Sequence, residues 1–264
     1  NPSIASTITI SGLNFDTVNG VSVLIDDDPC TVNAPSLTST SFDCVTPTGG
    51  GVSTGVFDVE VRNLDGGDGV TAYQADSVTN GFTFQDAPAI GSITPNAGAL
   101  AGGTVATISG TGFLSGLSAT IGGVSCTSIT AVTATSFNCG IPANASAGAV
   151  DVVVTNTDGQ TVTATNLYTY QVAPSIASVT PNAGAVAGTY TIRVLGADFL
   201  TGATVSIGST LCSSTTFINS GELQCVVPPS GAATNANVVV TNPDSQIDTL
   251  TNGFSYTNPP TIAR

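Results

Sequence analysis

The chain has 264 residues, and its 17 acidic side chains against three basic ones give it a net charge of −14. Such a charge repels the phosphate backbones of nucleic acids, which we do not expect as partners, and it disfavours binding to anionic membrane surfaces. No apolar run approaches the ~18 residues of a membrane-spanning helix, so we expect no membrane insertion. With 41% hydrophobic residues, the chain is too apolar to be disordered.

The side chains that most often carry catalysis are scarce. The chain has no histidine, which rules out Ser-His-Asp and Cys-His arrangements. Its two glutamates, Glu60 and Glu222, lie in distant parts of the chain and are not expected to form the carboxylate pair of a glycosidase. We therefore predict a protein without enzyme activity.

One pattern occurs three times along the chain, and each copy contains two cysteines at matched positions. The period of roughly ninety residues exceeds that of solenoid repeats and suits a small autonomous domain. C-x-x-C pairs and histidine partners, which zinc sites require, are lacking, so we expect one disulfide within each copy. The pairs are Cys30 and Cys44, Cys126 and Cys139, and Cys212 and Cys225.

These cysteines also indicate where the protein resides. Closing a loop of ~14 residues contributes roughly 3 kcal/mol to the stability of a small domain. Persistent disulfides require an oxidising location, which here means secreted, periplasmic or cell-surface. Buried free thiols are the alternative, because cysteine packs well as a small hydrophobic residue.

Acidic residues gather in the first copy. Asp26, Asp27 and Asp28 are adjacent, and a connection longer than in the other copies holds Asp65 and Asp68 among glycines. Calcium binds carboxylate oxygens in loops of this kind, but EF-hand spacing is lacking. A solvated acidic loop is the preferred interpretation and a calcium site the alternative. No other cofactor is expected.

Apolar and polar residues alternate with a period of two through most of the chain, and helical periodicity is nearly absent. In the third copy, short runs rich in β-branched residues are separated by Gly, Pro, Asn and Ser clusters, which is typical of an all-β sandwich. The predicted strands are residues 175–180, 190–195, 204–207, 211–216, 222–227, 237–241 and 253–256.

Domain boundaries are predicted at two Ala-Pro dipeptides, because proline fixes φ and favours an extended residue before it. The resulting domains span residues 1–87, 88–173 and 174–257, and a tail follows at 258–264. Linkers this short should restrict the angle between consecutive domains. We therefore expect three tandem sandwiches in a semi-rigid rod.

Four motifs carry a resemblance to a known family. The third copy opens with P-S-I-A-S-V-T-P-N-A-G at 174–184 and continues with G-A-D-F at 196–199, C-V-V-P at 225–228 and V-V-V-T-N at 238–242. The second copy repeats this pattern, and the first joins it from G-L-N-F at 12–15 onward. The chain thus resembles tandem IPT/TIG domains, which are immunoglobulin-like modules shared by plexins, transcription factors and many bacterial surface proteins.

The resemblance implies an early-set immunoglobulin-like sandwich without an active site of its own. Members of this family commonly serve as spacers, as adhesive modules or as companions of carbohydrate-active domains. Those that contact DNA do so through basic loops, which this sequence lacks, so that function is not carried over.

Two recurring polar and aromatic patterns are interpreted as structural. Each copy has an Asn-x-Asp motif, at Asn63, Asn156 and Asn242, where we predict a hairpin turn because Asn and Asp tolerate left-handed backbone. Each copy also ends in two aromatic residues, of which one should face the core and the other the domain junction or solvent. These are Phe82 and Phe84, Tyr168 and Tyr170, and Phe254 and Tyr256.

The two ends of the sequence are complementary. The second and third copies open with a strand and a T-P-N-A-G turn, which the first copy lacks. A spare strand could fill such an open edge in another molecule, and a head-to-tail contact of this kind generates an open filament unless it closes into a ring. The tail provides a match to the opening strand through Pro260, Thr261, Ile262 and Ala263.

We therefore predict a non-enzymatic extracellular structural protein, the subunit of a filament or appendage, whose partner is another copy of itself. In a second interpretation the chain is a stalk segment excised from a large surface adhesin, and its partners are neighbouring repeats of the same longer chain. In a third it is a carbohydrate-binding accessory module for a glycan or surface receptor, with Tyr73 as a candidate contact.

Overall fold

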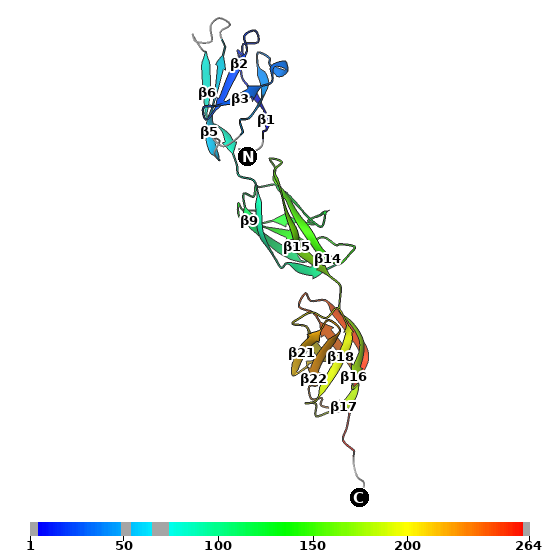
Figure 1. Cartoon of the computed structure of the whole chain (residues 1–264). Coiled ribbons are helices and arrows are strands. Elements are labelled where there is room, and N and C mark those ends of the chain that lie inside the picture. The colour runs from blue at the N-terminus through cyan, green and yellow to red at the C-terminus, as the bar shows by residue number, and fades with distance from the viewer. Residues whose placement is uncertain (1–4, 49–53, 65–73, 261–264) are drawn as a thin grey trace.

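The computed structural model describes residues 5–48, 54–64 and 74–260. These residues form three β-sandwiches that follow one another in a rod (Figure 1). The architecture is all-β, as predicted, with one short 3-10 helix at Ala34–Ser36. Within the described ranges, no helix is long and apolar enough to cross a membrane.

The described residues of the first sandwich form six antiparallel strands in the order β1-β4-β3-β2-β5-β6. Strand β3 pairs with both β2 and β4 and so joins the two halves of the sandwich. Val23, Ile25, Phe42 and Cys44 form the centre of its core. The strands are β1 (Thr7–Ser11), β2 (Val21–Ile25), β3 (Asp28–Val32), β4 (Ser41–Val45), β5 (Gly55–Asn63) and β6 (Ala75–Phe84).

The second sandwich has two separate sheets, with strand orders β12-β13-β9-β7 and β11-β10-β14-β15-β8. Side chains at alternate positions of each strand face the space between the sheets, as in Val152 and Val154 of β14, which are fully buried. The strands are β7 (Ala89–Thr94), β8 (Ala97–Ala99), β9 (Val105–Thr111), β10 (Ser118–Ile121), β11 (Val124–Ser125), β12 (Ile129–Thr130), β13 (Ser136–Gly140), β14 (Gly148–Thr155) and β15 (Thr161–Gln171).

The third sandwich repeats this topology with sheets β16-β18-β22-β21 and β17-β24-β23-β19-β20. In both domains the opening strand changes sheets: β7 and β16 pair antiparallel in one sheet, and β8 and β17 pair parallel in the other. The strands are β16 (Ser175–Thr180), β17 (Ala183–Ala185), β18 (Thr191–Ala197), β19 (Thr204–Ile207), β20 (Thr210–Leu211), β21 (Ser214–Asn219), β22 (Glu222–Val226), β23 (Asn235–Thr241) and β24 (Ile247–Thr257).

The predicted strands of the third domain agree with the structure to within two residues at each end, except at three places. The run at 211–216 divides between β20 and β21, and β17 was not predicted. The run at 253–256 is only the end of β24, which begins at Ile247. Asn252 interrupts the alternation there with a φ of 54°, opposite a register shift in β23, and this bulge hides the first half of the strand from a period-two pattern.

Candidate functional site

The predicted disulfides are present in all three domains, with Cα–Cα distances of 5.9, 5.5 and 5.7 Å in chain order. In the second and third domains each bridge joins an inner strand of one sheet, β13 or β22, to the residue after the short edge strand of the other sheet. The bridges therefore tie the two sheets of a sandwich together. The pairs are Cys30–Cys44, Cys126–Cys139 and Cys212–Cys225.

The adjacent aspartates of the first domain form a hairpin turn. Asp26 and Asp27 connect β2 to β3 with φ angles of 54° and 64°, and Asp28 begins β3 opposite Ile25. Two residues with positive φ are the geometry of a tight two-residue hairpin, which Asp tolerates well. Across the residues with described positions, no three Asp, Glu, Cys or His side chains group so as to hold a metal ion.

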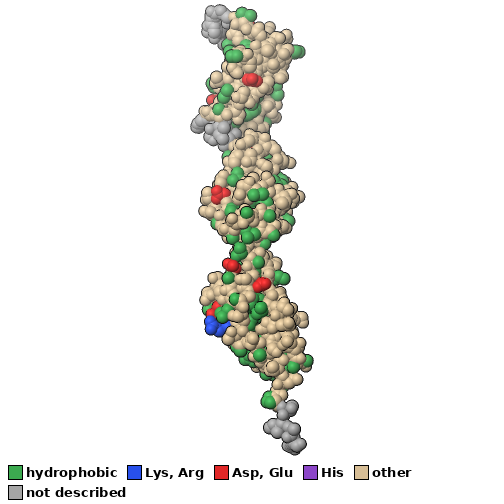
Figure 2. Space-filling model, turned by 90° about the vertical axis from the view of Figure 1, so that its right-hand side faces the viewer, with side chains coloured by type: hydrophobic (Ala, Val, Ile, Leu, Met, Phe, Trp, Pro, Cys, Tyr) green, Lys and Arg blue, Asp and Glu red, His purple; other side chains and the backbone are tan. Residues whose placement is uncertain are grey.

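The remaining calcium candidates, Asp65 and Asp68, lie outside the described residues, and so does Tyr73. The calcium alternative for the loop that contains these two aspartates stays a prediction. On the face of the molecule shown in Figure 2, the few acidic side chains are scattered over the three domains.

The asparagine of each Asn-x-Asp motif holds a neighbouring loop. Asn156 Oδ1 accepts a hydrogen bond from the Leu114 amide at 3.1 Å, and its Nδ2 donates to the Gly112 carbonyl at 2.7 Å. Asn63 and Asn242 make the corresponding pairs of bonds in their domains. In the second and third domains the motif is therefore a turn whose first residue fastens the loop after β9 or β18, which confirms the prediction of a turn there. In the first domain Asp65 lies outside the described residues.

The paired aromatic residues belong to the core. Tyr168 and Tyr170 are 0% and 1% exposed, and their rings meet edge to face with centroids 5.1 Å apart. The expectation that one of each pair faces outward is wrong in the second and third domains, because residues two positions apart on a strand lie on the same face. In the first domain Phe84 is buried and Phe82 half-buried.

The two tyrosine hydroxyls of the second domain differ in their partners. Tyr170 donates to the Pro142 carbonyl at 2.7 Å. The Tyr168 hydroxyl is buried and finds no hydrogen-bond partner in the described part of the chain. Burial, with smaller contributions from Tyr170 and Asp244, raises the pKa of Tyr168 to about 12.

The two glutamates are each paired with an arginine. Glu222 on β22 accepts two hydrogen bonds from Arg193 on β18, both at 2.7 Å, and Glu60 accepts two from Arg62 at 2.7 and 2.8 Å. The guanidinium hydrogen bonds lower the pKa of both carboxyl groups. Carboxylates held in the ionised form in different domains do not offer the proton donor that glycoside hydrolysis requires.

The joints between domains repeat one polar contact. Gln246, in the turn before β24, donates from Nε2 to the Gln171 carbonyl at the end of β15 at 3.1 Å, and also to Asp244 at 2.7 Å. Gln160 of the second domain donates to the Gln85 carbonyl of the first at 3.5 Å and to its own aspartate in the same way. The aspartate therefore orients the glutamine toward the preceding domain.

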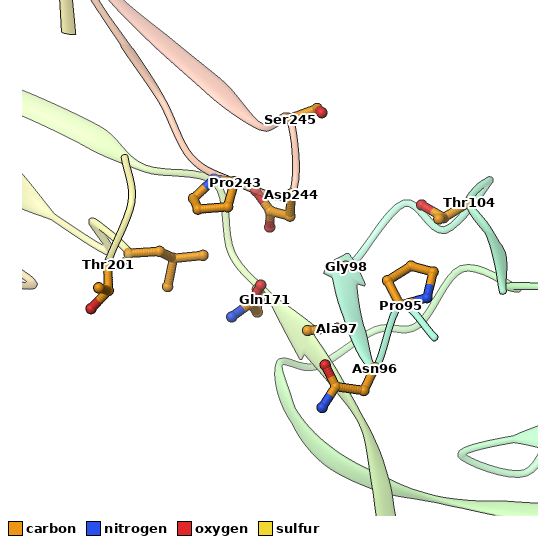
Figure 3. A pocket seen from close by; sticks show the side chains of 11 residues that line it. Pro95, Asn96, Ala97, Gly98, Thr104, Gln171, Thr201, Pro243, Asp244 and Ser245 are labelled. Carbon is orange, nitrogen blue, oxygen red and sulfur yellow. The ribbon is translucent and has the colours of Figure 1, made fainter. Parts of the chain in front are cut away.

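A cleft of about 640 Å³ lies at the joint of the second and third domains. Gln171 stands between the two sides of the cleft, with Asn96 and Ala97 on one side and Pro243 and Asp244 on the other (Figure 3). Asp244 is the single charged side chain of its wall. The cleft therefore lacks a pair of catalytic or metal-binding groups, and its walls are those of a domain joint.

The first domain has an open sheet edge. β9 lies between β13 and β7, and β18 lies between β22 and β16. β1 is the counterpart of β9 and β18, because Ile8 of β1 lies opposite Cys44 as Ala106 of β9 lies opposite Cys139. No described strand lies on the other side of β1. Ile8 and Ile10 of β1 are consequently half-buried, whereas Ala106 and Ile108 of β9 are fully buried.

The strand order of the first domain also ends at β6 within the described residues. The counterparts of β6, which are β15 and β24, carry the parallel strands β8 and β17. A groove of about 320 Å³ runs beside β1, with Val59, Val61 and Val78 among its apolar lining and Gln74 and Asp76 as polar lining. It occupies the place that the opening strand fills in the other two domains.

The predicted assembly residues are only partly described. Pro260 is exposed at the end of the described chain, and Thr261, Ile262 and Ala263 lie outside it. Their role stays a prediction. Sequence analysis did not single out Gln74, which lines the groove beside β1 and has no motif around it.

The IPT/TIG domain family matches residues 1–84, 88–170 and 174–257. The chain belongs to the IPT/TIG family. Three TIG domains in tandem, each with its own disulfide, indicate an extracellular repeat protein.

Other proteins share features of this TIG array at low sequence identity. The plexin A4 extracellular region has 17% identity and a TM-score of 0.44 over 98% of this chain and 23% of that chain. SGBP-B of the Bacteroides ovatus mixed-linkage glucan utilization locus, in complex with a mixed-linkage heptasaccharide, has 14% identity and a TM-score of 0.31 over 96% of this chain and 64% of that chain. The titin I9–I11 tandem has 10% identity and a TM-score of 0.32 over 95% of this chain and 93% of that chain.

At TM-scores below 0.5, these solved structures carry no argument about the function of the TIG array. The chain spans less than a quarter of the plexin A4 chain that it matches. A search of curated proteins returned no match.

Proposed function

We propose that the chain is a structural subunit that assembles head to tail into an extracellular filament, in which the C-terminal tail of one copy fills the open edge of the first domain of the next. The observation that carries this proposal is the outer edge of β1, which pairs with no strand among residues 5–48, 54–64 and 74–260, whereas both counterparts, β9 and β18, have a strand there. An exposed sheet edge is a template for pairing with another chain, and a fixed partner protects it from aggregation.

The tail has the sequence that this edge requires. Pro260 begins a Pro-Thr-Ile-Ala stretch that corresponds to Pro174-Ser-Ile-Ala, and the latter forms the start of β16, which pairs with β18. The described part of the tail leaves the third domain at the end away from the second domain (Figure 1). Donor and acceptor therefore lie in different end domains of a rod, as a head-to-tail contact requires.

The contact is heterologous, because the donor and acceptor surfaces differ. Repetition of a heterologous contact produces an open fibre when the rotation between subunits does not close. The short linkers and the glutamine contacts at both internal joints favour a stiff subunit, so that each joint adds length along one direction. Local disulfides stabilise each domain without linking the copies covalently.

A glycan-binding function has less support. Stacking on sugars requires exposed aromatic rings, and the paired aromatic residues at the end of each domain belong to the core. The stalk of a large adhesin would use the same kind of joint but within one covalent chain. The mass of denatured native material distinguishes these two arrangements, because a stalk requires a chain much longer than 264 residues.

The experiment is to compare the purified chain with a variant that lacks residues 259–264. We expect polymers of the intact chain in negative-stain electron micrographs and in light scattering, and monomers of the variant. A variant with these residues replaced by Gly and Ser serves as the control for chain length and should also be monomeric. Fibres that form equally well without the tail sequence would refute strand donation, and an intact chain that stays monomeric at high concentration would refute the filament.

A further inference from the structure

Resting on this proposed assembly, we infer that the joint between subunits copies the joint between the second and third domains. Gln74 and Asp76 on the groove of one copy bind the backbone of Thr257 and Ile262 in the preceding copy. Three independent features of the first domain support this inference: a carboxylate, an amide side chain and a glycine. In the third domain the carboxylate and the glycine at these positions contact the opening strand β16, and the amide side chain binds the end of the preceding domain.

The carboxylate is the most specific feature. In the third domain the backbone amide of Ile176, on β16, donates to Asp248 Oδ2 at 2.6 Å. Asp248 lies on β24 opposite Val240, and Asp76 lies on β6 opposite Val61 in the same register. Asp76 is exposed on the groove and therefore stands where an incoming strand presents the corresponding amide.

This carboxylate is not required by the fold, because the second domain has Val162 at the same position. The opening strand of the second domain reads Pro-Ala-Ile-Gly from Pro88, whereas the tail reads Pro-Thr-Ile-Ala and the opening strand of the third domain reads Pro-Ser-Ile-Ala. The donor sequence and the acceptor residue thus both match the opening strand of the third domain and its carboxylate partner, rather than their counterparts in the second domain. Such agreement is expected if tail and groove form one interface.

The amide side chain is Gln74. The Asn63 amide donates to the Gln74 carbonyl at 3.0 Å, as the Asn242 amide donates to the Gln246 carbonyl at 2.9 Å. Gln74 is therefore the counterpart of Gln246. Gln246 binds the carbonyl of Gln171. Gln171 is the last residue of β15 that pairs with β8, and Thr257 is the last residue of β24 that pairs with β17, so Thr257 is the counterpart of Gln171. Gln74 is exposed, and its counterpart Gln246 is half-buried at the joint.

The glycine provides room for the donor backbone. A Cβ on Gly196 would overlap the Ser175 carbonyl oxygen of β16, and one on Gly110 would overlap a carbonyl of β7 in the same way. Gly12 occupies this position at the end of β1, where no described strand covers it. The Thr261 carbonyl of an incoming tail can therefore approach as closely as Ser175 does.

These correspondences define a register. Ile176 pairs with Gly196 on β18, so Ile262 lies opposite Gly12, and the residue two positions later, Arg264, lies opposite Ser11. Ile176 packs against the core of its own domain. The Ile262 side chain accordingly covers the apolar lining of the groove in the neighbouring copy.

Cross-linking tests the register. Single variants Ser11→Cys and Arg264→Cys are purified separately, mixed and oxidised mildly. We expect disulfide-linked dimers on a non-reducing gel from the mixture and none from either variant alone. Thr9→Cys in place of Ser11→Cys is the control, because it lies on the same strand two positions away. Equal dimer yield from both mixtures would overturn the register.

Substitutions test the two side-chain contacts. We expect Asp76→Val and Gln74→Ala each to weaken self-association roughly tenfold or more, because each loses a hydrogen bond of the joint, one of them to a charged group. The melting temperature should not change, since both side chains are exposed and the second domain has valine at the first position. Gln224→Ala, on β22 and away from both ends, is the matched control.

The outcomes separate this inference from the proposed function. The inferred joint would be overturned if the chain forms filaments, the Ser11→Cys and Arg264→Cys variants do not cross-link, and Asp76→Val and Gln74→Ala self-associate with unchanged affinity. The proposal of a filament would still hold in that case. Failure of the unmodified chain to polymerise would refute the filament and the joint together.

Discussion

The hydroxyl of Tyr168 lies directly against Gly98, so closely that a Cβ on this glycine would collide with it. Gly98 belongs to β8, the short parallel strand that covers β15. The glycine thus makes space for a hydroxyl that forms no hydrogen bond within the described part of the second domain. The corresponding residues of the other domains are Phe82 and Phe254, which have no hydroxyl to accommodate.

Removing this hydroxyl should stabilise the second domain. We expect Tyr168→Phe to raise its free energy of unfolding by about 1 kcal/mol, because a buried polar group without a partner carries a desolvation cost. Tyr170→Phe should lower it by about 1 kcal/mol, because its hydroxyl donates to the Pro142 carbonyl. Urea unfolding followed by tyrosine fluorescence measures both. Equal effects of the two substitutions would contradict the assignment of partners.

The raised pKa of Tyr168 should make the second domain less stable at alkaline pH. The pKa of Tyr168 is about 12 in the folded chain against 10.0 for a free side chain. Between these two values the unfolded state releases its proton while the folded state retains it, so the free energy of unfolding falls as the pH rises. Melting temperatures of the second domain should therefore decline above pH ~10. They should decline less in Tyr168→Phe, and identical profiles would refute this source of the decline.

Each disulfide should stabilise its own domain alone. Replacing Cys126 and Cys139 by alanine opens a loop of 13 residues and should cost the second domain roughly 3 kcal/mol. The unfolding transitions of the first and third domains should remain in place, because their bridges are local. Calorimetry of the double variant resolves these transitions. A shift of all three would show that the domains unfold as one unit.

Gln246 should govern the stiffness of the second joint. In Gln246→Ala the hydrogen bond to the Gln171 carbonyl is lost, and we expect a wider range of angles between the second and third domains. Small-angle X-ray scattering should report a shorter mean length of the rod, while the stability of either domain changes by no more than about 0.5 kcal/mol. Gln224→Ala should leave the scattering curve unchanged. A curve for Gln246→Ala that matches the unsubstituted chain would assign the stiffness to the linker itself.

Local features of the sequence were sufficient to predict the elements of this fold. Alternation with a period of two marked β16 at 175–180 and β19 at 204–207 to the residue, because a sandwich strand buries every second side chain. The matched cysteines predicted the three bridges, since each joins positions close in sequence. The same pattern failed for β24, where the bulge at Asn252 shifts the alternation.

The sequence by itself determined that the chain is a disulfide-bonded array of three similar β-domains, because strand periodicity, turn residues and cysteine spacing are each encoded within a few neighbouring residues. Only the tertiary structure decided which groups meet across strands and domains. The partner of Gln246 is 75 positions away at Gln171, and that of Ile176 is 72 positions away at Asp248. Such contacts depend on strand register and on the packing of one domain against the next, which local patterns do not specify.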